Sequence, residues 1–413
     1  MDKDEKIMKL EAMIGNMDLA KKAYLVDLYH KAGYKHEQYL ETDNKRPGPS
    51  MEASEGQKDE MHDRDNFANK EKRKRKFMLT SNKLNLELID WSKLVGIHNL
   101  KNDVNKIFFV SQPMGAFVIK MCSDVVPSYF GSRVLQCLQI PTPDIKILPF
   151  YDPEFKAMVH SMEALSLHDD HLRYIIRLSM DRPFILLQEY IPAITLDKLG
   201  DRRAERCLST NYADASSRLI NIGRIIAADL LLNNNDRFPL IWDNDGNYGN
   251  ILFEVKTDEK IDDDLLMEPN YTDLNFDNSV AIDTTCHCLD ETNRYGQRGT
   301  EKYLARLRDF INALFSDLKG IVSGKFSVNE YDYASIRPLA AFVHSHAGYD
   351  IRGRSLFRII EGIVIGLFNI KNMGVAVLEQ LLAHTETAVK KDWKSVWSNV
   401  SAIVNFRARP PSR

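Results

Sequence analysis

The sequence predicts an α+β fold, in which a small antiparallel β-sheet is followed by a larger helical region. Two observations support this prediction. Residues 77–192 contain short apolar runs of strand length with few helical stretches between them. Residues 193–413 repeat apolar side chains every three or four positions, which is the spacing of one face of an α-helix. We therefore expect two parts, 77–192 and 193–413.

Composition excludes several classes of protein. The chain has 413 residues, 44% hydrophobic and 27% charged, and its net charge of −3 gives no overall attraction to nucleic acid or to a membrane. An odd number of cysteines, five, argues for reduced thiols rather than a secreted disulfide framework. The charged N-terminus MDKDEKIMKLEAM does not resemble a signal peptide. The most apolar helix, at 356–370, contains Arg358 and Glu361 and is expected in the core. We expect a cytoplasmic protein with no nucleic-acid and no membrane partner.

The first 76 residues are expected to lie outside the two main parts. Segment 1–40 has apolar residues near one helical face, which are Leu10, Ile14, Met17, Tyr24 and Leu28. This pattern predicts an accessory helical segment packed on the main domain, with a partner-binding helix as the alternative. Residues 41–76 are polar and predict a disordered charged linker. The basic run KEKRKRK at 70–76 is expected to be its solvated end, and the alternatives are a nuclear localisation signal or a contact with an acidic surface.

The elements of the two parts follow in chain order. In the first part we expect strands at 106–110, 115–120, 145–150 and 184–191, with one principal helix at 126–138. Pro141 and Pro143 end that helix. In the second part we expect a helix at 219–230 and further helices near 301–319, 335–347, 354–369 and 373–400.

The segment that carries chemistry is LLLNNNDRFPLIWDNDGNYGNILFEV at 230–255, together with AIDTT at 281–285. Asp236 follows the apolar helix, Asn250 opens an apolar strand, and a second strand at 280–282 presents Asp283 at its end. Two carboxylates and an asparagine at adjacent strand ends suit phosphoryl transfer. Asp236 would orient the attacking hydroxyl, and Asn250 and Asp283 would supply oxygen ligands for magnesium. The alternatives are a C-cap or turn residue at Asp236, a turn residue at Asn250 and an N-cap at Asp283.

The chain before this segment contains a matching half of such a site. The run AFVIK at 116–120 ends in Lys120 and looks like the protein-kinase strand that places a lysine on the nucleotide phosphates. The run FILLQEYI at 184–191 looks like the kinase segment whose backbone meets the adenine base. Its last residues are Gln188, Glu189, Tyr190 and Ile191. These positions, followed by Asp236, Asn250 and Asp283, stand in the protein-kinase order.

The run NNNDR…GN…NILFE, followed by a strand and AIDTT, resembles the catalytic domain of the actin-fragmin kinase family, a group of atypical protein kinases. Ordinary kinases have four residues between the catalytic aspartate and the asparagine, whereas thirteen separate Asp236 from Asn250 here. The resemblance covers roughly residues 85–400. It implies a two-lobed protein-kinase-like fold, with a β-sheet N-lobe at 77–192 and a helical C-lobe at 193–413. It also implies ATP and Mg²⁺ as cofactors, and a protein substrate phosphorylated on serine or threonine, such as actin or an actin-capping complex.

Two departures from the kinase pattern keep other functions open. The helix PSYFGSRVLQCL contains no acidic residue, and Ser128 stands where a kinase carries its lysine-binding glutamate. The nearest acid in sequence is Asp124, and Asp283 is the other candidate partner of Lys120 when nucleotide is absent. The phosphate-covering region 93–115 contains only two glycines and no GxGxxG, so Lys101 or Asn102 would have to substitute.

These departures favour a pseudokinase scaffold that retains the fold as the first alternative to an active kinase. A kinase-like phosphotransferase acting on a small molecule or a lipid is the second. The run Cys286-His287-Cys288 suggests zinc, but no second pair of ligands stands at the spacing that a zinc site requires. We therefore do not predict a zinc site.

Overall fold

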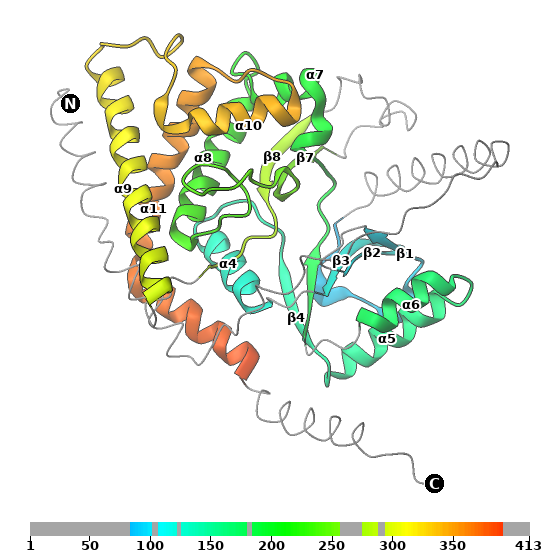
Figure 1. Cartoon of the computed structure of the whole chain (residues 1–413). Helices are drawn as coiled ribbons and strands as arrows, with labels where there is room; N and C mark the ends of the chain where they lie inside the picture. Colours follow the sequence, from blue (N-terminus) through cyan, green and yellow to red (C-terminus); the bar gives the residue numbers. More distant parts are fainter. Residues whose placement is uncertain are drawn as a thin grey trace, which may run out of the picture.

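The computed structural model describes residues 83–100, 106–121, 125–179, 184–256, 275–287 and 294–390. The predictions for 1–40 and 41–76, and those for Lys101, Asn102 and Asp124, lie outside the described residues. The described part is an α+β fold with a small antiparallel sheet and many helices, which confirms the predicted class (Figure 1).

The larger sheet has five strands in the order β1-β2-β3-β5-β4, and all neighbouring pairs are antiparallel. The strands are β1 (Gly96–Leu100), β2 (Lys106–Gln112), β3 (Gly115–Met121), β4 (Ile145–Pro149) and β5 (Phe184–Glu189). Two short 3-10 turns, Leu86–Leu88 and Trp91–Lys93, precede it. Every residue of the central strand β3 is buried, which explains its nearly continuous apolar run GAFVIKM. Lys120 is the charged residue in this otherwise apolar strand, and it is buried too. It lies opposite Leu186 of β5.

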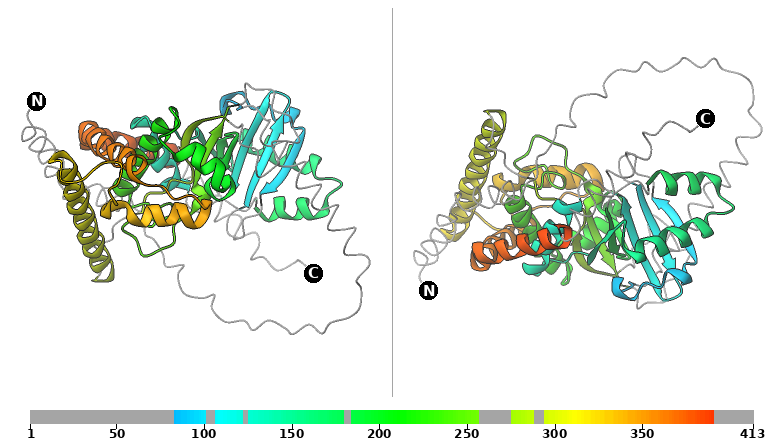
Figure 2. Two further views of the ribbon diagram at one scale, coloured as in Figure 1. Left: turned by 90° about the horizontal axis from the view of Figure 1, so that it is seen from above. Right: turned by 90° about the horizontal axis from the view of Figure 1, so that it is seen from below.

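The two faces of β3 contact different surroundings because side chains alternate along a strand. Phe117 and Ile119 belong to a buried cluster that also contains Trp91 and the apolar sides of α5 (Pro153–Leu165) and α6 (Asp170–Ser179). Figure 2 shows these two helices along one side of the sheet. Ala116 and Val118, on the other face, belong to a separate small cluster with Phe109 and Tyr190.

The prediction of a single principal helix in this region was wrong. Helix α4 (Val125–Cys137) lies where it was expected, but α5 and α6 also occupy the chain between β4 and β5. The start of α5 follows ordinary helix rules. The Asp152 carboxylate accepts a hydrogen bond from the main-chain N–H of Glu154 as an N-cap, and Pro153 stands in the first turn. Phe155, Met158 and Met162, spaced three and four residues apart, bury one face of the helix.

The second part of the chain contains a three-stranded antiparallel sheet and five helices within the described residues. The strands, in the order β6-β7-β8, are β6 (Ala193–Thr195), β7 (Ile251–Val255) and β8 (Phe276–Ala281). The helices are α7 (Leu196–Leu208), α8 (Ala215–Leu232), α9 (Arg294–Val322), α10 (Arg337–Ala347) and α11 (Gly353–Lys390). The expected helices at 354–369 and 373–400 are the two halves of α11, which breaks at Gly374 with φ of 70°.

Helices α8 and α11 form the centre of the main core. A Cβ atom at Gly223 of α8 would lie 2.0 Å from the main-chain oxygen of Ile359, and one at Gly362 of α11 would lie 2.1 Å from that of Ile220. Glycine therefore lets the two backbones touch. Residues 353–385 of α11 are long and apolar enough to cross a membrane by length and composition. Core helices pass the same test, and the face of α11 that carries Leu356 and Ile360 is buried in the core.

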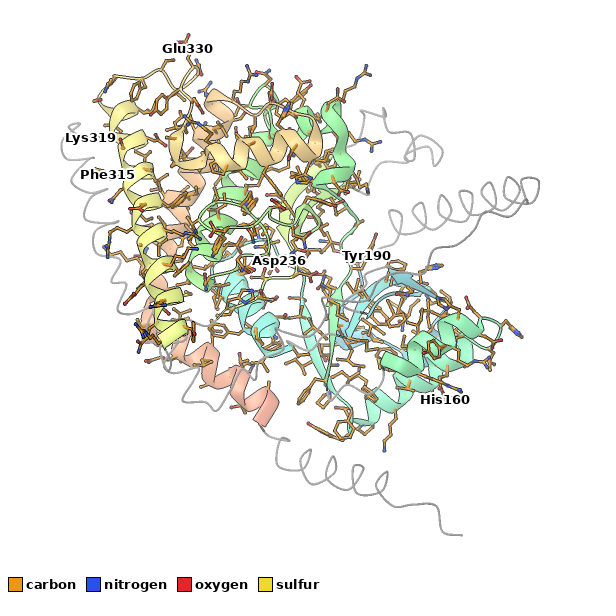
Figure 3. The ribbon with its side chains drawn as sticks, viewed as in Figure 1. His160, Tyr190, Asp236, Phe315, Lys319 and Glu330 are labelled. Atoms are coloured by element: carbon orange, nitrogen blue, oxygen red, sulfur yellow. The ribbon has the colours of Figure 1, made fainter. Side chains whose placement is uncertain are left out.

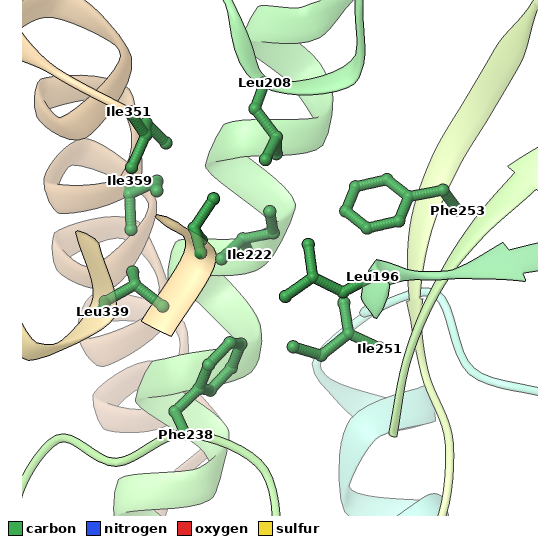
Figure 4. Close-up of a pocket in the computed structure, with 10 residues that line it drawn as sticks. Leu196, Leu208, Ile222, Phe238, Ile251, Phe253, Leu339, Ile351 and Ile359 are labelled. Atoms are coloured by element: carbon green, nitrogen blue, oxygen red, sulfur yellow. The ribbon is translucent and has the colours of Figure 1, made fainter. Parts of the chain in front are cut away.

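A small void remains inside this core (Figure 4). It is lined by ten apolar side chains, which are Leu196, Leu208, Ile222, Phe238, Ile251, Phe253, Leu339, Val343, Ile351 and Ile359. Its volume of about 10 Å³ is room for one water molecule at most. Its lining has no polar group that could bind a ligand, so this void is a packing defect and not a functional site.

Candidate active site

Asp236 and Asn250 are joined directly by hydrogen bonds. Helix α8 ends at Leu232 because Asn233 adopts a left-handed conformation with φ of 52°, and the chain then turns to the exposed Asp236. Asn250 is buried at the end of the 3-10 turn Tyr248–Asn250 and leads into β7. Its side-chain amide donates to the main-chain oxygen of Asp236 at 2.7 Å and to carboxylate Oδ2 at 2.9 Å. The amide oxygen of Asn250 is left as the atom that can bind a cation.

Asp283 lies two residues beyond β8 and pairs with Lys120. Its φ of 53° is in the left-handed region, which is uncommon for a residue other than glycine. The Lys120 ammonium group forms an ion pair with carboxylate Oδ1 of Asp283. Lys120 is buried, with 7% of its surface exposed, whereas the Asp283 side chain is 36% exposed, so the pair lies where the buried strand β3 meets solvent. Strained backbone of this kind is found most often at functional sites.

The sheet of β6, β7 and β8 brings these two pairs together. Ile251 of β7 lies opposite Ala281 of β8, and the main-chain N–H of Ile282 donates to the oxygen of Asn250 at 3.2 Å. Asn250 and Asp283 are therefore held on neighbouring strand ends. Their donor set, an amide oxygen and a carboxylate, fits magnesium, which takes one or two carboxylates and completes its shell with water or phosphate oxygens. Among the described residues, no group of three or more His, Cys, Asp or Glu forms a metal cluster.

The segment predicted to meet adenine borders the same region. Gln188 and Glu189 end β5, and Tyr190 and Ile191 follow it as buried residues. The rings of Tyr190 and Phe109 meet edge to face, with centroids 4.8 Å apart. Figure 3 labels Tyr190 and Asp236 in the middle of the view, whereas His160 lies on the outer helix α5. The buried cluster of Tyr190 and Phe109, which also includes Ala116 and Val118 of β3, fixes the chain at the point where β5 ends.

Burial raises the pKa of the Glu189 carboxyl above its usual range, although the main-chain N–H of Asp144 donates to it at 3.2 Å. Lys83, which forms an ion pair with Glu254 at 2.5 Å, opposes that shift. The end of β5 therefore carries a carboxylate that is costly to ionise.

The loop of thirteen residues between Asp236 and Asn250 contacts helix α9 through Asp243. The carboxylate of Asp243 forms ion pairs with Lys302 at 2.8 Å and with Arg306. Hydrogen bonds from Arg306 and Lys302 lower the pKa of Asp243 to about 2. Trp242 Nε1 also donates to Asn233 Oδ1 at 3.0 Å. The long loop is therefore an ordered structure that spans from α8 to α9.

Helix α4 reaches the site without a carboxylate. A Cβ atom at Gly131 would lie 2.7 Å from the main-chain oxygen of Thr284, so the helix touches the residue after Asp283. Ser128 stands three residues before Gly131 and shares its face of the helix. Within the described residues, the carboxylate that the structure assigns to Lys120 is Asp283.

Sequence reasoning missed Asp229 and Arg237. Both side chains are completely buried, and they form an ion pair. A signal was present in the sequence, because Asp229 interrupts the apolar run AADLLL and a buried charge requires a partner. Arg237 follows Asp236 directly, and its other contacts lie at the strand ends.

A lysine on a sheet strand facing an aspartate at a strand end, with an asparagine and a second aspartate beside them, is the arrangement of a kinase-like phosphotransferase. The comparison with known families agrees. The family model described as the catalytic domain of actin-fragmin kinase matches residues 69–367, and the chain belongs to this family.

Two Dictyostelium discoideum proteins, both provisionally named actin-fragmin kinases, are similar to the chain. One is 27% identical over 239 residues, which are 56% of this chain and 52% of that protein. The other is 21% identical over 287 residues, which are 68% of this chain and 58% of that protein. The chain therefore spans a little over half the length of the curated relatives it matches.

Proposed function

We propose that this chain transfers the γ-phosphoryl group of ATP to a serine or threonine hydroxyl of a protein substrate, with actin or an actin-capping complex as the first candidate. The observation that carries this proposal is the meeting of two pairs, Asp236 with Asn250 and Lys120 with Asp283, at the ends of β7 and β8. In this proposal the five-stranded sheet region is the N-lobe of a protein kinase, and 193–413 is the C-lobe.

Each residue has a defined task in the transfer. The main chain at 188–191 holds the adenine, and Lys120 binds phosphate oxygens. Bound magnesium, held by Asn250 and Asp283, would neutralise charge that develops on the phosphates. Asp236 is exposed and accepts the proton of the acceptor hydroxyl. The hydroxyl oxygen forms a bond to the γ-phosphorus, the bond to the oxygen bridging the β- and γ-phosphates breaks, and ADP leaves with that electron pair.

One observation favours a second candidate, the pseudokinase scaffold. Helix α4 brings no carboxylate to Lys120 within the described residues, and the lysine takes Asp283 instead. In this arrangement the ion pair with Lys120 competes with metal binding at Asp283. In a scaffold without catalytic activity, the ion pair between Lys120 and Asp283 would remain in place.

The deciding experiment uses purified chain, labelled ATP, magnesium and actin, and compares the wild type with Asp236→Asn. We expect the variant to bind ATP normally and to lose transfer by about a hundredfold or more, because it lacks a positioned base. Asp245→Asn, an exposed aspartate in the same loop, is the matched control and should transfer like the wild type. A wild type that binds ATP and labels neither actin nor a general protein acceptor would support the scaffold.

A further inference from the structure

Arg237 is a buried side chain that connects the three segments carrying the predicted base, Asp236, and the predicted metal ligands, Asn250 and Asp283. It follows Asp236 in the chain. Its Nε donates to the main-chain oxygen of Asn250 at 3.1 Å. Its Nη2 donates to the main-chain oxygen of Ile282 at 2.8 Å and to Oγ1 of Thr284 at 2.7 Å. The last two acceptors are the residues on either side of Asp283.

The other side of the guanidinium is anchored to a helix. Its Nη1 contacts Oδ1 of Asp229, which projects from α8 and is itself completely buried. Asn234 donates to the same carboxylate oxygen at 2.8 Å. Separating the two partners of a completely buried ion pair is costly, because each charge would then lie unpaired and away from water. The position of Arg237 relative to α8 is therefore fixed. Through Arg237, the loop that carries Asp236 and the two strand ends are all attached to Asp229 of α8.

We propose that Arg237, anchored by Asp229, is a positioning residue that sets the distances between Asp236, Asn250 and Asp283. It touches neither nucleotide nor metal in this assignment. It acts on the oxygen ligands by holding the backbone at Asn250 and on both sides of Asp283. The proposal rests on the function proposed above, in which these residues hold magnesium and orient the acceptor.

The chemistry of arginine explains why this residue type stands here. Four of the contacts converge on one planar group with donors in a fixed fork. A lysine has a single nitrogen on a flexible stem, so it can keep the ion pair to Asp229 but cannot reach three separate acceptors on two strand ends at once. Arg237→Lys should therefore preserve the buried charge and lose the alignment.

The chain offers a matched control in Arg218, which is also completely buried. It pairs with Asp214 at 3.0 Å and donates to the main-chain oxygens of Cys207 at 3.1 Å and Phe276 at 2.7 Å. Phe276 is the first residue of β8, at the end of the strand opposite to Asp283. Arg218→Lys therefore disturbs a buried arginine of the same kind away from the predicted ligands.

The experiment measures magnesium-dependent ATP binding and amide hydrogen exchange for the wild type, Arg237→Lys and Arg218→Lys. For Arg237→Lys we expect about a tenfold or larger increase in the magnesium concentration that supports half-maximal ATP binding, the size seen when residues behind a metal ligand are changed. Exchange should increase at 248–251 and 282–285, where the Ile282 amide is bonded to the Asn250 oxygen. For Arg218→Lys we expect unchanged magnesium dependence and faster exchange near 207 and 276.

Two results would overturn the proposal. One is a folded Arg237→Lys protein whose magnesium dependence and local exchange match the wild type. The other is an equal loss of magnesium dependence in Arg218→Lys, which would show a general effect of loosening the core. Should Arg237→Lys fail to fold, Thr284→Val keeps the buried ion pair and removes the Oγ1 acceptor of Nη2. Exchange at 282–285 should then increase, and the absence of this increase would count against the proposal. The exchange experiment needs no phosphoryl transfer, so it can fail or succeed independently of the proposed activity.

Discussion

Lys120 and Asp283 form an ion pair across 163 residues of sequence, and this pair joins the five-stranded sheet to the end of β8. The same carboxylate is the predicted magnesium ligand. Binding of Mg-ATP in the proposed function therefore brings a second cation to the carboxylate that Lys120 contacts through Oδ1, while Lys120 moves toward the phosphates.

The first prediction concerns this carboxylate. Asp283→Ala should weaken Mg-ATP binding by about tenfold or more, because the metal loses its charged ligand. Binding of ATP without magnesium should change less. Calorimetric titration with and without magnesium measures both. Asp277→Ala is the control, since Asp277 lies near the start of β8, the strand that leads to Asp283, in an exposed pair with Lys256. Equal losses in the two variants would argue against a ligand role for Asp283.

The second prediction concerns the contact of α4 with Thr284. Replacing a helical glycine by alanine ordinarily stabilises a protein by about 0.4–1 kcal/mol. Gly299 of α9 has open space around its Cβ position, so Gly299→Ala should follow this rule. At Gly131 the Cβ would lie 2.7 Å from the Thr284 main-chain oxygen, so Gly131→Ala should instead cost about 1–3 kcal/mol. Denaturant unfolding of both variants tests the prediction, and shifts of the same sign would refute it.

Much of the fold was predictable because its strands and helices follow simple patterns. The run at 115–120 is apolar along its whole length and became the buried β3, and the expected helix at 126–138 became α4. Helices α5 and α6 were missed, although Asp152 and Pro153 signal a helix start. The short apolar runs on both sides of them favoured a continuous series of strands. Only tertiary packing shows that a pair of helices covers the outer face of that sheet.

The predicted catalytic and metal-binding residues of the candidate site could be selected from the sequence, but the residue that holds them together could not. Asp236, Asn250 and Asp283 could be selected because their residue types and order match a known chemistry. The role of Arg237 could not be predicted, because its acceptors are main-chain oxygens at Asn250 and Ile282 that no sequence pattern marks. Its partner Asp229 lies on a helix and is brought near by the turn at 233–235. Contacts of this kind depend on three-dimensional packing alone.

The third prediction concerns the pH dependence of stability. Burial raises the pKa of Glu189 in the folded protein above the ordinary value of 4.5. At pH values between the pKa of Glu189 in the unfolded chain and its higher pKa in the folded protein, the folded protein binds more protons. The free energy of unfolding therefore decreases as the pH rises through this range. Glu189→Gln keeps an oxygen for the Asp144 N–H and removes the charge. Its free energy of unfolding relative to the wild type should therefore become more favourable from pH 4 toward neutral pH. Urea unfolding at several pH values measures this difference, and a difference independent of pH would contradict the assignment.

The last prediction addresses the missing acidic residue of α4. Ser128 lies on the face of the helix that, at Gly131, touches Thr284, the residue next to Asp283. A carboxylate at this position would approach Lys120 from the helix and compete with Asp283 for it. Ser128→Glu should then release Asp283 for magnesium. We expect tighter Mg-ATP binding and a severalfold rise in phosphoryl transfer.

The matched control for this prediction is Ser128→Gln, which has the same length and no charge. A gain shared by both variants would show an effect of packing, and the electrostatic explanation would fail. A wild type with robust transfer and no response to Ser128→Glu would show that the pair of Lys120 with Asp283 does not limit the reaction. Since Ser128 is itself half-buried, a new charge there that does not pair with Lys120 should destabilise the fold. Denaturant unfolding of the glutamate variant therefore provides a second, independent measurement.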